Sequence, residues 1–463
     1  MKGRLNKIYP VERIEGNGNL IITLDERERI LGITFSAAEL RGFENICIGR
    51  MIWEMPGITS RICGICSVSH TLASVLAAEN VLNAKVPETA VLQRTLLNFG
   101  QIIYSHIEQL FLLSSPEWLK KEGIKDIIDL VKRKKELFEI GLAVKKTAYN
   151  LITEIGGSLI SPATVIPGGM TKALTIEAGE SLYKIANESL NNALKLFEVI
   201  LDGLNFIKNK NQKFDNITNY FLFLGSKFNP VFMSDKVFII DNKLAHISEF
   251  EVCDYKKHII EGIREYSHSK FPYLASKGYP EGIYTVGPIA RFLGTEKYET
   301  NNAERCAKVL RSLVNNGNLT GYFNAAIRGV EIVYAIEKSL EILHNKKLFG
   351  REYRIKVERR EGRGVGAVEA PRGTLIHEYE CDDLGKVTYA NFIVATTHNS
   401  SAINYGLELS VSKFKGEKIS DVLIKEAKEA VRNYDPCLSC ATHIVKVKVE
   451  KLINKIDVIN ETT

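Results

Sequence analysis

Two Cys-x-x-Cys pairs near opposite ends of the chain constrain its fold more than any other feature. Cys63 and Cys66 form the first pair, and Cys437 and Cys440 form the second, in a chain of 463 residues. Thiolates bind soft or borderline metal ions, and one Cys-x-x-Cys turn can present two sulfurs to a single ion. The pairs therefore predict a metal centre that brings the two ends of the chain together.

The residues alone leave the kind of metal centre open. A structural zinc site, an iron-sulfur cluster and a catalytic metal site all use such cysteines. Zinc ribbons place their two pairs roughly 15–20 residues apart, far closer than the pairs of this chain. Eight cysteines are too few and too scattered for a disulfide scaffold. The others are expected to be small buried hydrophobic residues: Cys47, Cys253, Cys306 and Cys381.

Composition and charge argue against several classes of protein. The 61 basic and 55 acidic residues are mixed along the chain and give a net charge of +6, without the basic block that nucleic-acid binding uses. No run approaches the roughly 18–20 apolar residues of a membrane span, and the start lacks the apolar segment of a secretory signal. We expect a cytoplasmic enzyme with no nucleic-acid partner and no membrane span.

Helical spacing of apolar residues dominates the sequence. Helices are predicted within 88–155, 172–210 and 302–344, over 71–84 with Ser67 or Ser69 as N-cap, and over 418–433. Strands are predicted within 8–40, around 362–373 and 389–395, and at 445–449, while 211–300 is irregular and partly β. The glycine-rich run at 362–366 is too loosely spaced for a phosphate-binding loop. These patterns predict an α+β fold, mainly α, with a bundle of long helices and small peripheral β-sheets.

The sequence around the cysteines sharpens this prediction. The segments Arg61–His70 and Asp435–His443 closely resemble the two metal-binding signatures of the nickel-iron hydrogenase large (catalytic) subunit. Further motifs of that family follow in the family's order: Val11–Gly16, Leu40–Glu44, Pro167–Gly169, Glu369–Gly373 and Val394–Asn399. The resemblance implies the large-subunit fold of that family, as one co-folded domain over residues 1–443.

The resemblance implies roles for the four cysteines. Cys63 and Cys437 would be terminal nickel ligands, while Cys66 and Cys440 would bridge nickel to an iron that carries CO and cyanide ligands. Soft sulfurs suit nickel, and a non-bridging thiolate stays basic enough to take a proton. Cys437 is the expected base in the reversible heterolytic cleavage of H2.

Three further residues are expected to act in catalysis through the resemblance. Glu15 matches a carboxylate through which protons leave the site. Arg372 matches an arginine over the open face of the metals, and Asp435 matches a carboxylate that holds it. Without the resemblance, Glu15 and Arg372 would be interpreted as a surface residue and an ion-pair residue.

Other matched residues surround the metals. His70 is expected to hydrogen-bond a bridging sulfur, with helix capping as the alternative. Ala395 and Thr396 match positions that cradle the cyanide ligands. A magnesium ion is expected near the C-terminus, because hard cations prefer oxygen ligands. Its ligands would be Glu44, the carbonyl of Phe392 and His443.

Three positions depart from the family pattern. Asn17 and Ser161 stand where many members have histidine, and Ser105, just before His106, stands where many have aspartate. The loss of that carboxylate leaves Asp435 as the main expected partner of Arg372. None of the departures removes a metal ligand.

The motifs most resemble those of cytosolic, multimeric hydrogenases. This type passes electrons through a small subunit with iron-sulfur clusters to acceptor subunits that use NAD(P), a deazaflavin-type flavin or a heterodisulfide reductase. The chain itself has too few cysteines for an iron-sulfur wire and lacks a dinucleotide fingerprint. A maturation protease and nickel chaperones are further expected partners, and residues 444–463 would be a removable precursor tail. The alternatives are a non-catalytic subunit like that of respiratory complex I and a zinc-stabilised scaffold.

Overall fold

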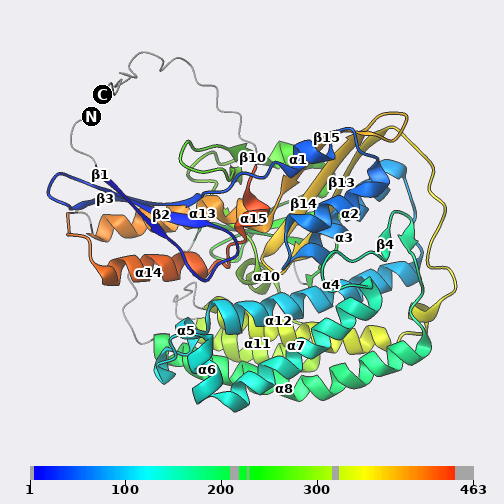
Figure 1. The fold of residues 1–463 in the computed structure, drawn as a ribbon, viewed down its shortest axis with the longest axis horizontal. Coiled ribbons are helices and arrows are strands. Elements are labelled where there is room, and N and C mark those ends of the chain that lie inside the picture. Colours follow the sequence, from blue (N-terminus) through cyan, green and yellow to red (C-terminus); the bar gives the residue numbers. More distant parts are fainter. Residues whose placement is uncertain (1–4, 209–217, 227–228, 315–322, 415, 444–463) are drawn as a thin grey trace, which may run out of the picture.

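A bundle of long helices forms one half of the molecule (Figure 1). The computed structural model describes residues 5–208, 218–226, 229–314, 323–414 and 416–443. The bundle contains α4 (Glu88–Glu108), α7 (Lys135–Gly156), α8 (Ile176–Lys208), α11 (Asn301–Val314) and α12 (Phe323–Leu343). α12 packs against α8 and α4, and α7 packs against both of these as well. Their apolar residues recur at helical spacing and form one hydrophobic core.

Short helices connect the layers around this bundle. They are α1 (Phe43–Cys47), α2 (Met55–Thr59), α5 (Ser115–Trp118), α6 (Ile127–Arg133), α9 (Tyr255–His258), α10 (Pro288–Gly294) and α15 (Leu438–Ala441). Among the described residues, no helix combines the length and the apolar character that crossing a membrane would require.

The first and last thirds of the chain meet in a second core. β1 (Leu5–Pro10), β2 (Gly18–Leu24) and β3 (Ile30–Ala37) form an antiparallel sheet. α13 (Ala395–Phe414) packs on β3, and α14 (Asp421–Arg432) shares the same hydrophobic cluster. In Figure 1 the blue strands lie beside the orange helices, so the fold brings the two ends of the chain together.

The predicted irregular region contains short strands. β6 (Tyr220–Ser226), β8 (Lys236–Asp241), β9 (His246–Glu251) and β12 (Tyr284–Thr285) form the main part of a five-stranded sheet that includes β7 (Asn229–Pro230). β10 (Ile259–Gly262) pairs with β11 (Phe271–Leu274), and β4 (Val165–Ile166) pairs with β5 (Gly169–Met170). The five-stranded sheet shares a third hydrophobic core with the three-stranded sheet formed by residues 362–393. The turn between the first two strands of that sheet carries Arg372.

That sheet and α3 position the cysteines. β13 (Gly362–Ala370), β14 (Gly373–Cys381) and β15 (Val387–Ile393) are antiparallel, and α3 (Ser67–Leu82) begins directly after Cys66 and packs on β13 and β14. The glycine-rich run is therefore a strand. A Cβ on Gly366 would lie 2.3 Å from the backbone nitrogen of Ala77 and 2.6 Å from the oxygen of Ala73. Only glycine allows α3 to approach this closely.

We expect Gly366→Ala to destabilise the protein by about 1–3 kcal/mol, because the added methyl group must push rigid backbone aside. Urea unfolding monitored by the fluorescence of Trp53 and Trp118 measures this loss. Gly32 in β3 is a matched control, since a Cβ there meets nothing within 4 Å. A Gly366→Ala protein as stable as Gly32→Ala would contradict the close-packing argument.

The α+β, mainly α prediction is confirmed, and most predicted elements exist. The helices predicted within 88–155 exist as α4 and α7, and a π-helical turn at Gln109–Leu113 separates α4 from the short helices before α7. The helix predicted over 71–84 begins at Ser67, and neither predicted serine caps it, because Cys66 precedes it without a side-chain cap hydrogen bond. Cys253 is exposed, contrary to prediction, while Cys47, Cys306 and Cys381 are buried. The strand predicted at 445–449 lies outside the described residues.

Candidate metal centre

The sulfurs of the two Cys-x-x-Cys pairs meet in the buried centre of the molecule. The Sγ atoms of Cys63, Cys66, Cys437 and Cys440 all lie within 4.8 Å of one another. Cys63 faces Cys437 at 3.3 Å, and Cys66 faces Cys440 at 3.2 Å. Each half of the chain therefore contributes one member to each facing pair. This confirms the prediction that the ends of the chain share one metal-binding group.

Backbone contacts hold the second cysteine pair against the N-terminal segment. Glu15 and Cys437 form an isolated parallel β-bridge, and the amide of Leu438 donates to the carbonyl of Glu15 at 2.9 Å. A Cβ on Gly16 would lie 3.0 Å from Leu438, and one on Gly18 would lie 2.6 Å from it. The glycines thus admit the short helix α15, which carries Cys440.

The surroundings shift the pKa values of the cysteine thiols in different directions. Hydrogen bonds from neighbouring cysteines, with Cys437 first, lower the pKa of Cys63 well below its usual value, and the Arg372 guanidinium adds to this effect. Burial raises the pKa of Cys437 and of Cys440 well above the usual value. A cationic partner is therefore needed when all four sulfurs are thiolates, and a bound metal ion would supply it.

A small cavity of about 20 Å³ lies beside Cys66 and Cys440. Its walls are mostly apolar, and its polar lining residues include Arg372 and Thr396. Thr396 lies at the start of α13, whose positive N-terminal end favours anionic ligands. The adjacent sulfurs are soft donors of the kind that nickel and iron bind, and the polar groups could meet anionic ligands of such a metal. The lining residues are Cys66, His70, Ala370, Pro371, Arg372, Leu375, Val394, Ala395, Thr396, Cys437 and Cys440.

Thr396 also contacts the second cysteine pair. Its Oγ1 accepts a hydrogen bond from the backbone amide of Cys437 at 2.9 Å. This contact fixes the hydroxyl against the metal-binding loop. Ala395, its neighbour on the cavity wall, is buried as well. Both residues thus line the cavity beside the cysteines, and their roles toward cyanide remain a prediction.

Asp435 fixes the side chain of Arg372 near the cysteine sulfurs. Its Nε donates to the Asp435 carbonyl at 2.8 Å and its Nη2 to the Asp435 carboxylate at 3.0 Å. Ser105 is a weaker partner, with its Oγ at 3.4 Å from Nη1. Burial disfavours the guanidinium charge, but Asp435 and the cysteine sulfurs raise the pKa of Arg372 well above its usual value. Arg372 thus keeps a fixed positive charge in the neighbourhood of the sulfurs.

A second buried guanidinium lies near the same carboxylate. Arg328 on α12 is 3% exposed, and its Nη2 lies 3.9 Å from Oδ2 of Asp435. Burial raises the pKa of Asp435, while Arg372 and Arg328 act against this rise. Arg328 was not predicted from the sequence. An arginine at an inward-facing position of α12, directly after the buried Ile327, was the available signal.

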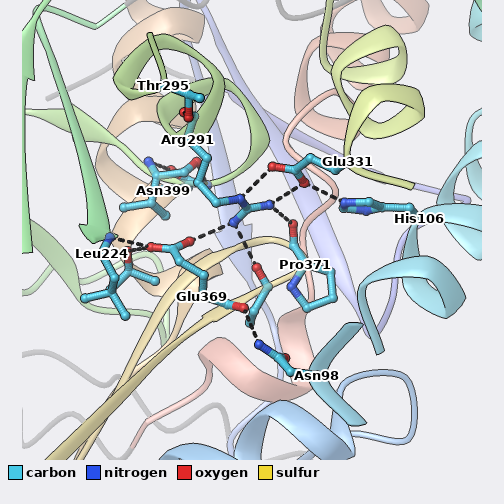
Figure 2. A network of polar contacts seen from close by, with 12 residues as sticks. Asn98, His106, Leu224, Arg291, Thr295, Glu331, Glu369, Pro371 and Asn399 are labelled. Carbon is cyan, nitrogen blue, oxygen red and sulfur yellow. Dashed lines mark hydrogen bonds and ion pairs between the residues drawn. The ribbon is translucent and has the colours of Figure 1, made fainter. Parts of the chain in front are cut away.

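An ion-pair network lies behind the loop that carries Arg372 (Figure 2). Arg291 donates to both carboxylate oxygens of Glu331 and to Glu369, each at 2.7 Å. The same guanidinium donates to the carbonyls of Ala370 and Pro371, each at 3.0 Å. The backbone directly before Arg372 is therefore held by one side chain.

The network also extends to the helix that carries Ser105, a contact of Arg372. Glu331 contacts His106 Nε2 at 2.7 Å, and His106 is adjacent in sequence to Ser105 (Figure 2). Burial raises the pKa of Glu331, but Arg291 outweighs this and lowers the value to about 2. Burial lowers the pKa of His106 to about 4, so that histidine is neutral. The Arg291 guanidinium thus forms ion pairs with two buried carboxylates, those of Glu331 and Glu369.

Glu15 connects the metal-binding group with the outside of the molecule. Its Oε2 lies 3.0 Å from Cys437 Sγ and accepts from the backbone amide of Ser439 at 3.1 Å. The hydroxyl of Ser439 donates to the other carboxylate oxygen. Glu15 is half-buried, whereas Cys437 is buried. The carboxylate is therefore placed to exchange a proton with Cys437 on one side and solvent on the other.

His70 contacts a sulfur of the second pair. Its Nε2 lies 3.3 Å from Cys440 Sγ, and its Nδ1 lies 3.1 Å from His377 Nε2. Its side chain is therefore engaged with the sulfur and not with the start of α3. His377 and its neighbour Tyr379 are further residues that were not predicted from the sequence.

The predicted magnesium ligands are partly brought together. His443 Nδ1 contacts the Glu44 carboxylate, and its Nε2 lies 3.1 Å from Thr397 Oγ1. Burial raises the pKa of Glu44, but the contact with His443 outweighs this and lowers it. α1, which carries Glu44, packs on β15, which carries Phe392. The described contacts do not join the Phe392 carbonyl to Glu44 or His443, so its role remains a prediction.

Comparisons with known proteins identify the family. The family model described as nickel-dependent hydrogenase matches residues 41–133 and 240–443. One relative, from the F420-non-reducing hydrogenase vhu of Methanococcus voltae, is 33% identical over 404 residues, which is 85% of this chain and 94% of the relative. The beta subunit of the NAD-reducing hydrogenase HoxS of Cupriavidus necator is 30% identical over 460 residues, 94% of each chain.

Solved structures agree with these matches. The crystal structure of an NAD+-reducing NiFe hydrogenase in the H2-reduced state superposes with a TM-score of 0.87 at 31% identity, covering 95% of this chain and 99% of that chain. The Ni-Fe-Se hydrogenase of D. vulgaris Hildenborough, at 19% identity and a TM-score of 0.76, shares the fold. The resemblance found in the motifs is confirmed. The chain belongs to the nickel-dependent hydrogenase family, a family of oxidoreductases.

Proposed function

We propose that the chain is the catalytic subunit of a nickel-iron hydrogenase and cleaves H2 reversibly into protons and electrons. The observation that carries this proposal is the meeting of the two cysteine pairs, with all four sulfurs within 4.8 Å of one another. Cys63 and Cys437 would hold the nickel, and Cys66 and Cys440 would hold the nickel and an iron together. The bound metals would supply the electron acceptor and the Lewis acid for H2.

Side chains of the protein itself would then accept the proton and transfer it out of the site. Cys437 accepts it at Sγ and passes it to Oε2 of Glu15, 3.0 Å away. Arg372 keeps a positive charge beside the sulfurs, and Asp435 keeps that guanidinium in place. The mostly apolar lining of the cavity beside Cys66 and Cys440 limits the access of water to the sulfurs. The half-buried position of Glu15 supports its role as the exit.

Electrons would leave where the first cysteine loop reaches the surface. Gly64, between the two cysteines, is exposed, and a Cβ there would meet nothing within 4 Å. The segment leading to this loop exposes apolar side chains, namely Ile46, Ile48 and Trp53. Exposed apolar side chains of this kind support docking of a small subunit whose iron-sulfur cluster would face the loop. The acceptor subunits would lie beyond that partner.

Elemental analysis and infrared spectroscopy of the purified complex test this proposal. We expect nickel and iron in equal amounts and absorption bands of CO and cyanide bound to iron. Cys66→Ser should lose the bands, because a hard hydroxyl is a poor bridging ligand for these metals, whereas Cys47→Ser should keep them. Zinc alone, without the bands, would establish the scaffold alternative. A protein without any bound metal would favour the other alternative, a non-catalytic subunit that resembles the one in respiratory complex I.

A precursor tail is the second part of the proposal. His443 contacts Glu44 and Thr397, so a magnesium ion bound by Glu44 and His443 would hold the chain's new end. We expect mass spectrometry of active enzyme to show a chain that ends at His443. Magnesium should be retained with it and lost in Glu44→Gln. An active, metal-loaded chain that still contains Thr463 would overturn the cleavage.

A further inference from the structure

A line of buried polar side chains runs from Cys440 into the layer between α3 and β14. His70 Nε2 lies 3.3 Å from Cys440 Sγ, and His70 Nδ1 lies 3.1 Å from His377 Nε2. His377 Nδ1 lies 3.1 Å from the Tyr379 hydroxyl, which lies 2.8 Å from Ser74 Oγ. The four side chains beyond the sulfur are at most 1% exposed. They form one continuous hydrogen-bonded line without access to water.

The residue spacing of α3 and of β14 brings these four side chains together. His70 and Ser74 are four residues apart on α3 and share a face of the helix, while His377 and Tyr379 are two residues apart on β14 and share a face of the strand. α3 packs against β14, so the two pairs meet. The line therefore depends on the close approach that the β13 glycines allow.

The sulfur determines the direction of every hydrogen bond in this line. A metal-bound thiolate only accepts, so His70 must carry its ring proton on Nε2 and leave Nδ1 as an acceptor. His377 must then donate from Nε2, and its Nδ1 accepts from the Tyr379 hydroxyl. Ser74 donates to that hydroxyl oxygen. Each donor has one acceptor, and all bonds point toward the sulfur.

The protonation of the groups agrees with this direction. Burial lowers the pKa of His377 well below its usual value. Burial raises the pKa of Tyr379 well above its usual value. The His377 ring is therefore neutral, and the phenol keeps the proton that it donates.

We propose that His377 and Tyr379 are positioning residues that lock His70 in the tautomer that donates to Cys440, and that they thereby set the electron density on this sulfur. The inference rests on the proposed function, because it takes Cys440 to be a metal-bound thiolate. Aligned hydrogen bonds polarise one another, so a distant member strengthens the bond at the sulfur. Partners of this kind tune metal ligands.

The CO stretching band of the iron measures this effect without reference to activity. His377→Leu leaves His70 Nδ1 without a donor and weakens the bond to Cys440, so the sulfur becomes more electron-rich. The CO band should move to lower wavenumber. Tyr379→Phe should move it in the same direction by less. His377→Gln, whose amide can still donate to His70, should restore the position toward that of the wild type.

A matched control separates this effect from the loss of any buried hydroxyl. The Tyr284 hydroxyl lies 2.6 Å from His398 Nδ1 in another buried tyrosine–histidine pair, and this pair has no described contact with a cysteine. Tyr284→Phe should leave the CO band in place. Equal shifts in Tyr284→Phe and Tyr379→Phe would overturn the proposal, as would an unshifted band in His377→Leu.

The tautomers can also be observed directly. The chain has nine histidines, so 15N NMR of the complex with ring-labelled histidine is tractable, and His70 and His377 variants assign the two signals. Both rings should carry their proton on Nε2, whichever metal the cysteines hold. A proton on Nδ1 of His70 would overturn the inference. Absence of CO bands in the wild type would instead count against the proposed function, while the NMR result would still decide the tautomer.

Discussion

Replacing Arg291 with methionine is expected to lower the free energy of unfolding by about 3–5 kcal/mol, the range for breaking a buried ion pair from one side. Arg291 is 0% exposed and is the partner of both Glu331 and Glu369. Its removal leaves two buried carboxylates without their cation. The carbonyls of Ala370 and Pro371 lose their donor as well. Urea unfolding of the complex, monitored by the two tryptophans, measures the change.

Two further variants show whether charge is the cause. Glu331→Gln removes one of the surplus negative charges, so Arg291→Met combined with Glu331→Gln should be more stable than Arg291→Met alone. Arg305 on α11 is exposed, and Arg305→Met should change stability by no more than about 0.5 kcal/mol. A loss below about 1 kcal/mol in Arg291→Met would mean that the pairing adds little beyond apolar packing.

The same substitution should disturb the site. Pro371 directly precedes Arg372, and His106, which Glu331 holds, directly follows Ser105. The positions of Arg372 and of its partner Ser105 thus both depend on one buried network. The folded fraction of Arg291→Met is expected to retain its cysteine-bound metals, because no cysteine belongs to the network. Its metal content distinguishes a misplaced Arg372 from a collapsed metal centre.

Residue spacing was enough to predict most of the elements. Apolar residues such as Leu190, Leu194 and Phe197 recur at helical spacing, and the structure buries or half-buries them in the bundle. The interruption at Gln109–Leu113 was not predictable in this way, because a π-helical turn shifts the helical phase only locally. The role of the β13 glycines depends on α3, which lies far away in sequence.

The residues of the site also differ in how far the sequence could predict them. The cysteines, Glu15 and Arg372 lie in contiguous motifs, so a resemblance could locate them. Arg291, Arg328 and Glu331 come from α10 and α12, and what defines them is a buried ionic partner elsewhere in the chain. Spacing within a helix indicates that a charged residue faces inward, but it does not identify that partner.

Glu15→Gln is expected to reduce the rate of H2 oxidation by about 10²–10⁴-fold, the usual contribution of a positioned proton carrier. The amide keeps the shape of the carboxylate and can still accept from Ser439, but it cannot take a proton from Cys437. Because Glu15 lies 3.0 Å from Cys437 Sγ and does not belong to the four-cysteine group, nickel, iron and the infrared bands should be unchanged. Hydrogenase assays of metal-matched samples measure the loss.

Isotope-exchange measurements decide whether the step lost in Glu15→Gln is the transfer of the proton out of the site. If H2 is still split and reformed inside the site, Glu15→Gln should convert para-H2 to ortho-H2 at a rate close to that of the wild type, while exchange of D2 with water protons slows with oxidation. Glu12→Gln is the matched control, because Glu12 is 64% exposed and pairs with Lys428 outside the site. Equal loss of both exchange reactions would place Glu15 in H2 splitting itself. A rate within about twofold of the wild type would assign the exit to another group, since a positioned proton carrier contributes far more than that.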